Sequence, residues 1–250
     1  MKPRGHSFYG SLLPIVVFLG LWELAARLFV ENPALLPPFS AVIREFLVLM
    51  DNGVLGVNFF HSLVRVLIGF LAGSIAGLIM GIMMGWKEVM HRSLHPIFSL
   101  LYPIPALGWL PVFMLWFGIG ELLPIAVIFM CSFFPVLYNT ETGIRSVNIN
   151  FIHAARTLGA SNGKILVTIL LPLALPNIFT GLRLESGMAW RVIIAAEMVA
   201  IPTGIGALLM RAESLVRVDI VIVCLMVLSI MCFSFERFFL FLEKKITGGW

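Results

Sequence analysis

The residues best placed to do chemistry are four charged side chains inside one apolar stretch, residues 175–200. They are Arg183, Glu185, Arg191 and Glu197. A charge near the middle of a bilayer costs about 2.5 to 3.5 kcal/mol on insertion scales, so such groups must pair, face water or lie near an interface. We therefore expect either a polar pathway beside this stretch or ion pairs within the protein.

Helical periodicity places Arg183, Trp190 and Glu197 on one face, because they are spaced by sevens along the stretch. This face is predicted to border a pathway. Glu197 is the candidate for a gate, and Arg191 is the deep cation that would attract an anion. Pairing between arginine and glutamate inside the chain explains the same charges equally well.

No nucleotide-binding loop is expected. The nearest approach has three residues between Gly159 and Gly163 instead of four, and Ile165 stands where a metal-binding hydroxyl is needed. The sequence also offers no nucleophile-and-base set and no carboxylate pair. We predict that the chain is not an enzyme and holds no cofactor of its own.

One histidine pair has the spacing of metal ligands. His91 and His95 are four residues apart and would share one face of a helix. No cysteine or acidic cluster near them in the sequence completes a site. The pair is therefore predicted to face a loop, with no metal.

The elements that carry these residues are predicted to be membrane helices. The chain has 250 residues, of which 60% are hydrophobic and 12% charged, and its mean hydropathy of +1.03 is too high for a water-soluble domain of this length. Its net charge of +4 comes from basic clusters between apolar runs, the pattern of membrane topology and not of nucleic-acid binding. We predict one all-α polytopic membrane domain over residues 1–250.

About six apolar runs approach the roughly 20 residues that a helical span needs. They are residues 12–30, 63–86, 96–117, 122–138, 175–200 and 220–242. The basic clusters fall on one side of these runs, which predicts that both termini are cytoplasmic. The first run is too long for a signal-peptide core and is expected to remain as an anchor.

Two of these runs carry a local structural signal. In the second, glycine recurs every four residues at Gly69, Gly73, Gly77, Gly81 and Gly85, which predicts a smooth ridge for close packing of a neighbouring helix.

The third run contains Pro103, Pro105 and Pro111, so it cannot be one uninterrupted α-helix. A broken helix at membrane depth is tolerated where it lines a cavity or is buried in protein. Pro103, Pro105 and the nearby Trp109 are therefore candidates for a pathway lining, with simple kinked packing as the alternative.

The connection after the fourth run is long and has the composition of a folded element. Ile152, Ala155 and Leu158 form a short apolar helical stripe, and Gly159 permits a sharp reversal. Ser161 or Asn162 can cap a second helix, which we expect to end at Pro172. Apolar residues with no lipid to meet indicate a protein partner.

The spacing of Ala154 and Ala155, Gly159, Ile169, Leu171 and Pro172 resembles the EAA loop of binding-protein-dependent ABC importer permeases. Four further segments resemble the nitrate, sulfonate and taurine branch of that family: residues 102–121, 155–161, 171–184 and 195–198. The resemblance covers nearly the whole chain from about residue 36 onward.

This resemblance implies that the loop, about residues 146–172, is a coupling helix that docks into a separate ATPase. The residues that would make this contact are His153, Ala154, Ala155, Arg156, Leu158, Gly159, Ala160, Ser161, Ile169, Leu171 and Pro172. His153 stands where the family usually has glutamate. We treat it as a tolerated polar residue, with proton sensing as the alternative.

The resemblance also implies an assembly in the prokaryotic cytoplasmic (inner) membrane. Its parts would be a second copy of this chain, two ATPase subunits carrying ATP and Mg²⁺, and a solute-binding protein outside. Transport would follow alternating access. The expected solute is a small anion such as nitrate, an alkyl sulfonate or taurine. The alternatives are a vitamin precursor such as a thiamine pyrimidine or riboflavin, or an ion-coupled secondary transporter.

Overall fold

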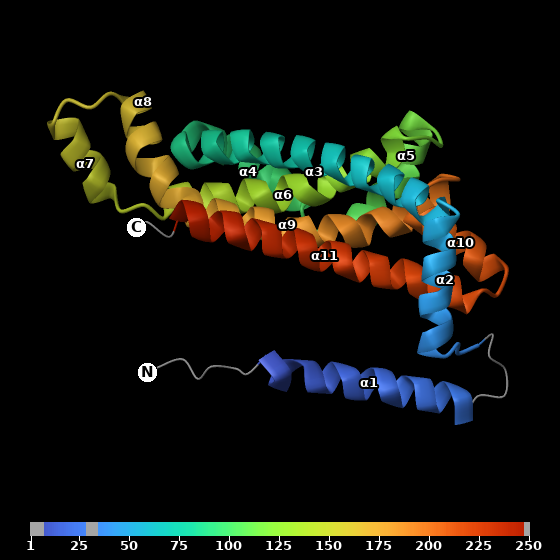
Figure 1. Ribbon diagram of the computed structural model, residues 1–250. Helices are drawn as coiled ribbons and strands as arrows, with labels where there is room; N and C mark the ends of the chain where they lie inside the picture. The colour runs from blue at the N-terminus through green and yellow to red at the C-terminus, as the bar shows by residue number, and fades with distance from the viewer. Residues whose placement is uncertain (1–7, 29–34, 248–250) are drawn as a thin grey trace.

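A computed structural model describes residues 8–28 and 35–247, and all regular structure within these ranges is helical (Figure 1). This confirms the predicted fold class. The elements in chain order are α1 (Phe8–Leu28), α2 (Phe39–Asp51), α3 (Val54–Trp86), α4 (Glu88–Leu101), η1 (Ala106–Trp109), α5 (Leu110–Phe117), α6 (Leu122–Arg145), α7 (Ile149–Thr157), α8 (Asn162–Ile165), η2 (Leu166–Leu170), α9 (Leu171–Ala200), α10 (Ile205–Ser214) and α11 (Val218–Thr247).

Four helices in the described ranges are long and apolar enough to cross a membrane, compared with about six predicted. They are Val54–Trp86, Leu122–Arg145, Asn162–Val199 and Val218–Ile246. A fifth span exists if Glu88–Leu101 and Ala106–Phe117, bent by 85°, count as one. The first predicted run, 12–30, coincides with α1 as far as Leu28, and its last two residues lie outside the described residues.

The spans form a bundle in which α3, α6, α9 and α11 run side by side, with α2 crossing one end (Figure 1). The predicted glycine ridge is confirmed as the seam between α3 and α6. A Cβ added at Gly77 would lie 2.5 Å from the carbonyl oxygen of Phe133, and one at Gly73 would lie 2.6 Å from that of Phe129. Only glycine lets these two backbones approach so closely.

The predicted break in the third span is also confirmed. Helix α4 ends at Leu101, and the chain resumes as η1 only after Pro105. Pro105 directly precedes η1 with an extended backbone (φ −57°, ψ 140°), so its missing N–H interrupts no helical ladder. The break turns the chain back beside α6 and α9 and provides one wall of a cavity.

The connection from α6 to α9 extends beyond the bundle at the end where α11 finishes (Figure 1). Gly159 reverses the chain with φ of +80°, and Ser161 caps α8. The predicted end of the second helix at Pro172 was wrong. The helix widens by one π-turn at η2 and continues into α9, with Pro172 in the first turn after the π-turn.

The α3–α6 seam generates a prediction about stability. Gly77→Ala should lower the free energy of unfolding by about 1 to 3 kcal/mol, because the new methyl group overlaps the α6 backbone. The matched control is Gly187→Ala in α9, where an added Cβ meets nothing within 4 Å. Thermal denaturation in detergent compares the two variants, and equal melting temperatures would contradict the role of the seam.

Candidate functional site

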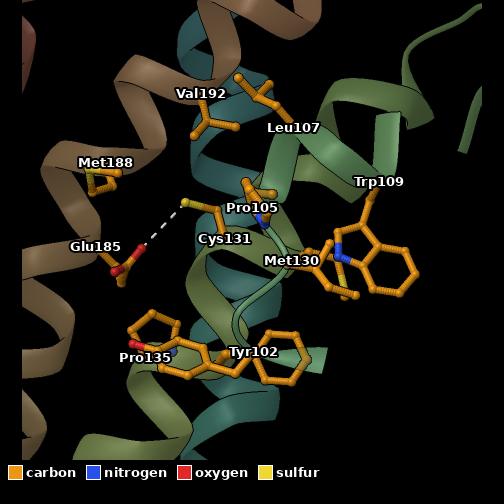
Figure 2. A pocket seen from close by; sticks show the side chains of 13 residues that line it. Tyr102, Pro105, Leu107, Trp109, Met130, Cys131, Pro135, Glu185, Met188 and Val192 are labelled. Carbon is orange, nitrogen blue, oxygen red and sulfur yellow. Dashed lines mark hydrogen bonds between the residues drawn. The ribbon is translucent and has the colours of Figure 1, made fainter. Parts of the chain in front are cut away.

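A cavity of about 360 Å³ lies between the broken span, α6 and α9 (Figure 2). The break contributes Tyr102, Pro105 and Trp109, α6 contributes Met130 and Cys131, and α9 contributes Glu185, Met188 and Val192. The wall is mostly apolar and aromatic. Such a cavity, with few and well-placed polar groups, is the usual form of a small-molecule site.

Glu185 is the one charged side chain among the described residues that line this cavity. It is only 7% exposed, and the thiol of Cys131 donates a hydrogen bond of 3.4 Å to its Oε2 atom (Figure 2). A thiol is a weak donor and does not balance a carboxylate. Glu185 is therefore a buried acid with spare acceptor capacity that faces an accessible space.

The structure brings two of the six predicted pathway residues, Pro105 and Trp109, to the cavity wall. Pro103 is exposed outside it. Arg191 is also exposed, and its Nη1 atom lies 3.4 Å from Sδ of Met188, a wall residue. Arg191 thus lies beside the cavity without lining it.

The face of α9 that borders the cavity differs from the predicted one. Glu185, Met188 and Val192 follow the i, i+3, i+7 spacing of one helical face. Trp190 lies on another face and is buried, with its ring stacked 6.3 Å from that of Phe59. The residues predicted to share one face of α9 do share it, but that face packs against α3 and α11.

Glu197 is fully buried and forms an ion pair with Arg65 of α3, with 2.7 Å between Nη1 and Oε1. The hydroxyl of Ser62 donates to both of its carboxylate oxygens at 2.8 Å, and the backbone N–H of Gly206 donates to Oε2 at 3.0 Å. Of the two explanations left open by the sequence, the structure shows intramolecular pairing for this glutamate.

Arg65 is 1% exposed, and its guanidinium donates five hydrogen bonds. Two go to Glu121 at 2.6 and 2.7 Å, two to the hydroxyl and carbonyl of Thr203, and one to Glu197. These use all five donors of the side chain. The hydrogen bonds from Arg65 also lower the pKa of the Glu121 carboxyl, which lies just before the α6 span.

Arg65 was not among the residues predicted to matter from the sequence, although a signal was present. It is a lone cation inside the second apolar run, and a charge in that position needs a partner or water. The partner could not be named, because Glu197 lies 132 residues further along the chain.

The loop residues predicted to contact a partner lie on α7, the reversal and the start of the helix that leads into α9. His153, Ala154, Arg156, Leu158, Gly159 and Ser161 are exposed, whereas Ala160, Ile169, Leu171 and Pro172 are partly buried. Ala155 packs in a small core with Ile144 of α6 and Ile165 of α8. Leu158 departs from the predicted stripe, because it is 88% exposed at the tip of the loop.

No acidic partner for the histidine pair was expected, but the structure places one beside it. Glu141 of α6 lies beside both rings, and the three side chains place ligand atoms within 4.8 Å of one another. The acid comes from a different helix, 50 residues from His91 along the chain, so local spacing could not reveal it.

Comparisons with known proteins agree with this architecture. Residues 69–248 match the family model described as "Binding-protein-dependent transport system inner membrane component". A chain of the inward-facing MetNI methionine ABC transporter superposes with a TM-score of 0.59 and 16% identity, covering 75% of this chain and 94% of the other. At that identity the likeness concerns the fold alone.

Sequence relatives cover nearly the whole chain. A provisionally named ABC transporter permease of Methanocaldococcus jannaschii is 38% identical over 90% of this chain and 86% of its own. The taurine transport permease of Escherichia coli K12 is 33% identical over 98% and 91%, respectively. A provisionally named aliphatic sulfonate permease of Bacillus subtilis is 32% identical over 98% of this chain and 90% of its own. The nitrate import permease of a Synechocystis strain is 33% identical over 93% of this chain and 87% of its own. These matches confirm the predicted branch.

The buried charge network generates a second prediction. Arg65→Met should destabilise the protein by about 3 to 5 kcal/mol, because it leaves the Glu197 carboxylate buried without its cation. Arg92→Met is the control, since its ion pair with Glu88 is exposed and screened by solvent, and so contributes little to stability. Thermal denaturation of both variants measures the difference. A melting temperature for Arg65→Met as high as that of the control would refute the structural role of the network.

Proposed function

The chain belongs to the family of binding-protein-dependent transport inner membrane components, as an ABC importer permease of the nitrate, sulfonate and taurine type, and on this premise we propose that it conducts a small aminosulfonate such as taurine. The observation that carries this choice of solute is Glu185 in the cavity. It refines the broader expectation of a small anion.

A carboxylate in a mostly apolar wall repels a simple anion and attracts an ammonium group. Taurine carries an ammonium at one end and a sulfonate at the other. Glu185 would accept hydrogen bonds from the ammonium, and Arg191, which reaches Met188 at the wall, would attract the sulfonate. Nitrate and unsubstituted alkyl sulfonates have no group for Glu185. The Escherichia coli relative named for taurine supports the same solute.

The working assembly in this proposal contains two copies of the chain, two ATPase subunits and a solute-binding protein, in the cytoplasmic membrane of a prokaryote. ATP and Mg²⁺ belong to the ATPase. Helices α7 and α8 would lie on the cytoplasmic side with both termini, and nucleotide-driven movement of the ATPase would open and close the cavity by alternating access.

Exposure of the loop supports docking at α7 and α8. Leu158 and Phe151 are large, exposed apolar side chains on α7 and at its end, outside the helices long enough to span a membrane. A surface of this kind fits a partner protein. His153 and Arg156 are exposed around it and would form a polar rim.

Docking at the loop can be tested with a charge at its tip. Leu158→Asp should abolish co-purification with the co-expressed ATPase subunit and reduce uptake to background, because an unpaired carboxylate would be buried in the contact. Leu215→Asp is the matched control, since Leu215 is also highly exposed but lies between α10 and α11, at the other end of the bundle (Figure 1). ATPase retained by Leu158→Asp and lost by Leu215→Asp would reverse the proposed orientation.

The solute can be tested with a matched pair of compounds, taurine and ethanesulfonate, which differ by the amino group. In proteoliposomes that contain the whole importer, Glu185→Gln should lower taurine uptake about tenfold or more, because a charge-assisted hydrogen bond of roughly 1.5 to 3 kcal/mol is lost. Ethanesulfonate uptake should not fall. An equal effect on both compounds would exclude Glu185 as the ammonium site while leaving the permease assignment intact.

A second candidate solute is an aminopyrimidine precursor of thiamine. The rings of Tyr102 and Trp109 in the cavity wall favour stacking on a flat heterocycle, and Glu185 can accept from its amino group. Competition against labelled taurine uptake separates the two. Inhibition by the aminopyrimidine at concentrations where ethanesulfonate has no effect favours the heterocycle.

A further inference from the structure

A second polar cluster lies away from the cavity, near the ends of α4 and α6 that face α7 (Figure 1). It contains His91 and His95, one turn apart on α4, and Glu141 near the end of α6. The centroids of the two imidazole rings are 4.7 Å apart. One nitrogen from each ring and one oxygen of Glu141 lie within 4.8 Å of one another.

Glu141 is a buried acid, only 5% exposed, with unusual partners. The nearby arginines are engaged elsewhere, since Arg145 and Arg92 both donate to Glu88, at 3.0 and 2.9 Å. Among the described residues, the polar partners of the Glu141 carboxylate are the two histidines. Its charge must therefore be balanced from that side.

A proton shared between Glu141 and His91 satisfies only those two groups of the cluster. Nδ1 of His91 contacts Oε1 of Glu141 directly. Nδ1 of His95 is buried, lies 3.9 Å from Oε2 and has no hydrogen-bond partner among the described residues. The hydroxyl of Tyr138, one turn before Glu141 on α6, is also buried without a partner there. A divalent cation bound between the three groups would use one nitrogen of each ring and would balance the negative charge of Glu141.

We propose that His91, His95 and Glu141 form a binding site for a divalent transition metal, with Zn²⁺ the best fit. Two imidazoles and a carboxylate are the donor set that Zn²⁺ accepts, with a fourth position left for water or a protein oxygen. Zinc–nitrogen bonds of about 2.0 to 2.1 Å bring tetrahedral ligands to roughly 3.4 Å from one another, so small rotations of the side chains suffice.

Such an ion would fasten α4 to α6. A chain of ring contacts connects the cluster to the cavity wall: His95 to Tyr138 with centroids 5.8 Å apart, then Tyr138 to Tyr102 with centroids 5.0 Å apart. Tyr102 is a wall residue at the point where the third span breaks. Metal binding would thus restrain this wall of the cavity from the opposite end of α4.

The test is Zn²⁺ binding to the full chain, purified in detergent with a tag that contains no histidine. Calorimetry should show one Zn²⁺ per chain, and Co²⁺ should produce the visible absorption bands of tetrahedral nitrogen and oxygen ligation. Because changes beyond the ligands already weaken metal sites by about 10- to 100-fold, the double variant His91→Gln/His95→Gln should bind at least about 100-fold more weakly. Glu141→Gln should also lose the Co²⁺ bands.

The controls are His61→Gln and His153→Gln, which remove histidines on α3 and α7 outside the cluster and should leave binding unchanged. Melting temperatures measured in chelator show whether each variant is folded. The absence of saturable binding to the unmodified chain would overturn the proposal, as would unchanged binding by the folded double variant. Loss of binding in His153→Gln alone would also overturn it, because the ion would then belong to α7.

Discussion

The contact on which most of the molecule depends is the ion pair between Arg65 and Glu197. It joins α3 to α9, and through Glu121, Thr203 and Gly206 it also holds the start of α6 and the loop into α10. Each donor and acceptor is used, which is the condition under which a buried pair can balance its desolvation. Gly204 is required beside it, because a Cβ there would lie 2.3 Å from the Glu197 carboxylate.

This pair also decides which way α9 faces. Glu185 lies 12 residues before Glu197, and at about 100° per residue the two carboxylates point about 120° apart around the helix. With Glu197 held against α3, Glu185 is turned toward α6 and the broken span. The two acids on one helix thus have different roles. One is neutralised by a cation of the fold, whereas the other, among the described residues, accepts a hydrogen bond only from the Cys131 thiol.

How far the sequence predicts the structure depends on whether the cause is local. The glycine seam, the proline break, the reversal at Gly159 and the helical class are set by residues close together in the chain, and all were predicted correctly. The partners of Arg65, Glu141 and Glu185 come from other helices, and no periodic pattern records which helices meet. The residues predicted to share one face of α9 do share it, but the sequence could not show that this face packs against α3 and α11. The helix expected to end at Pro172 continues past it and past Pro176, so a proline does not by itself mark where a membrane helix ends.

Helices α8, η2 and α9 form one continuous helical run from Asn162 to Val199 and therefore act mechanically as a single rod. At 1.5 Å per residue, about 35 Å of helix separate the tip at Asn162 from Glu185. A stiff rod transmits an axial push or a twist along that length with little loss. The π-turn at η2 widens its ladder, and Pro176 inside α9 cannot donate to it, so the rod can bend at either point. Asn162 and Glu185 therefore lie on one continuous helix, and a displacement of its tip would be carried to the cavity wall to the extent that the helix does not bend between them.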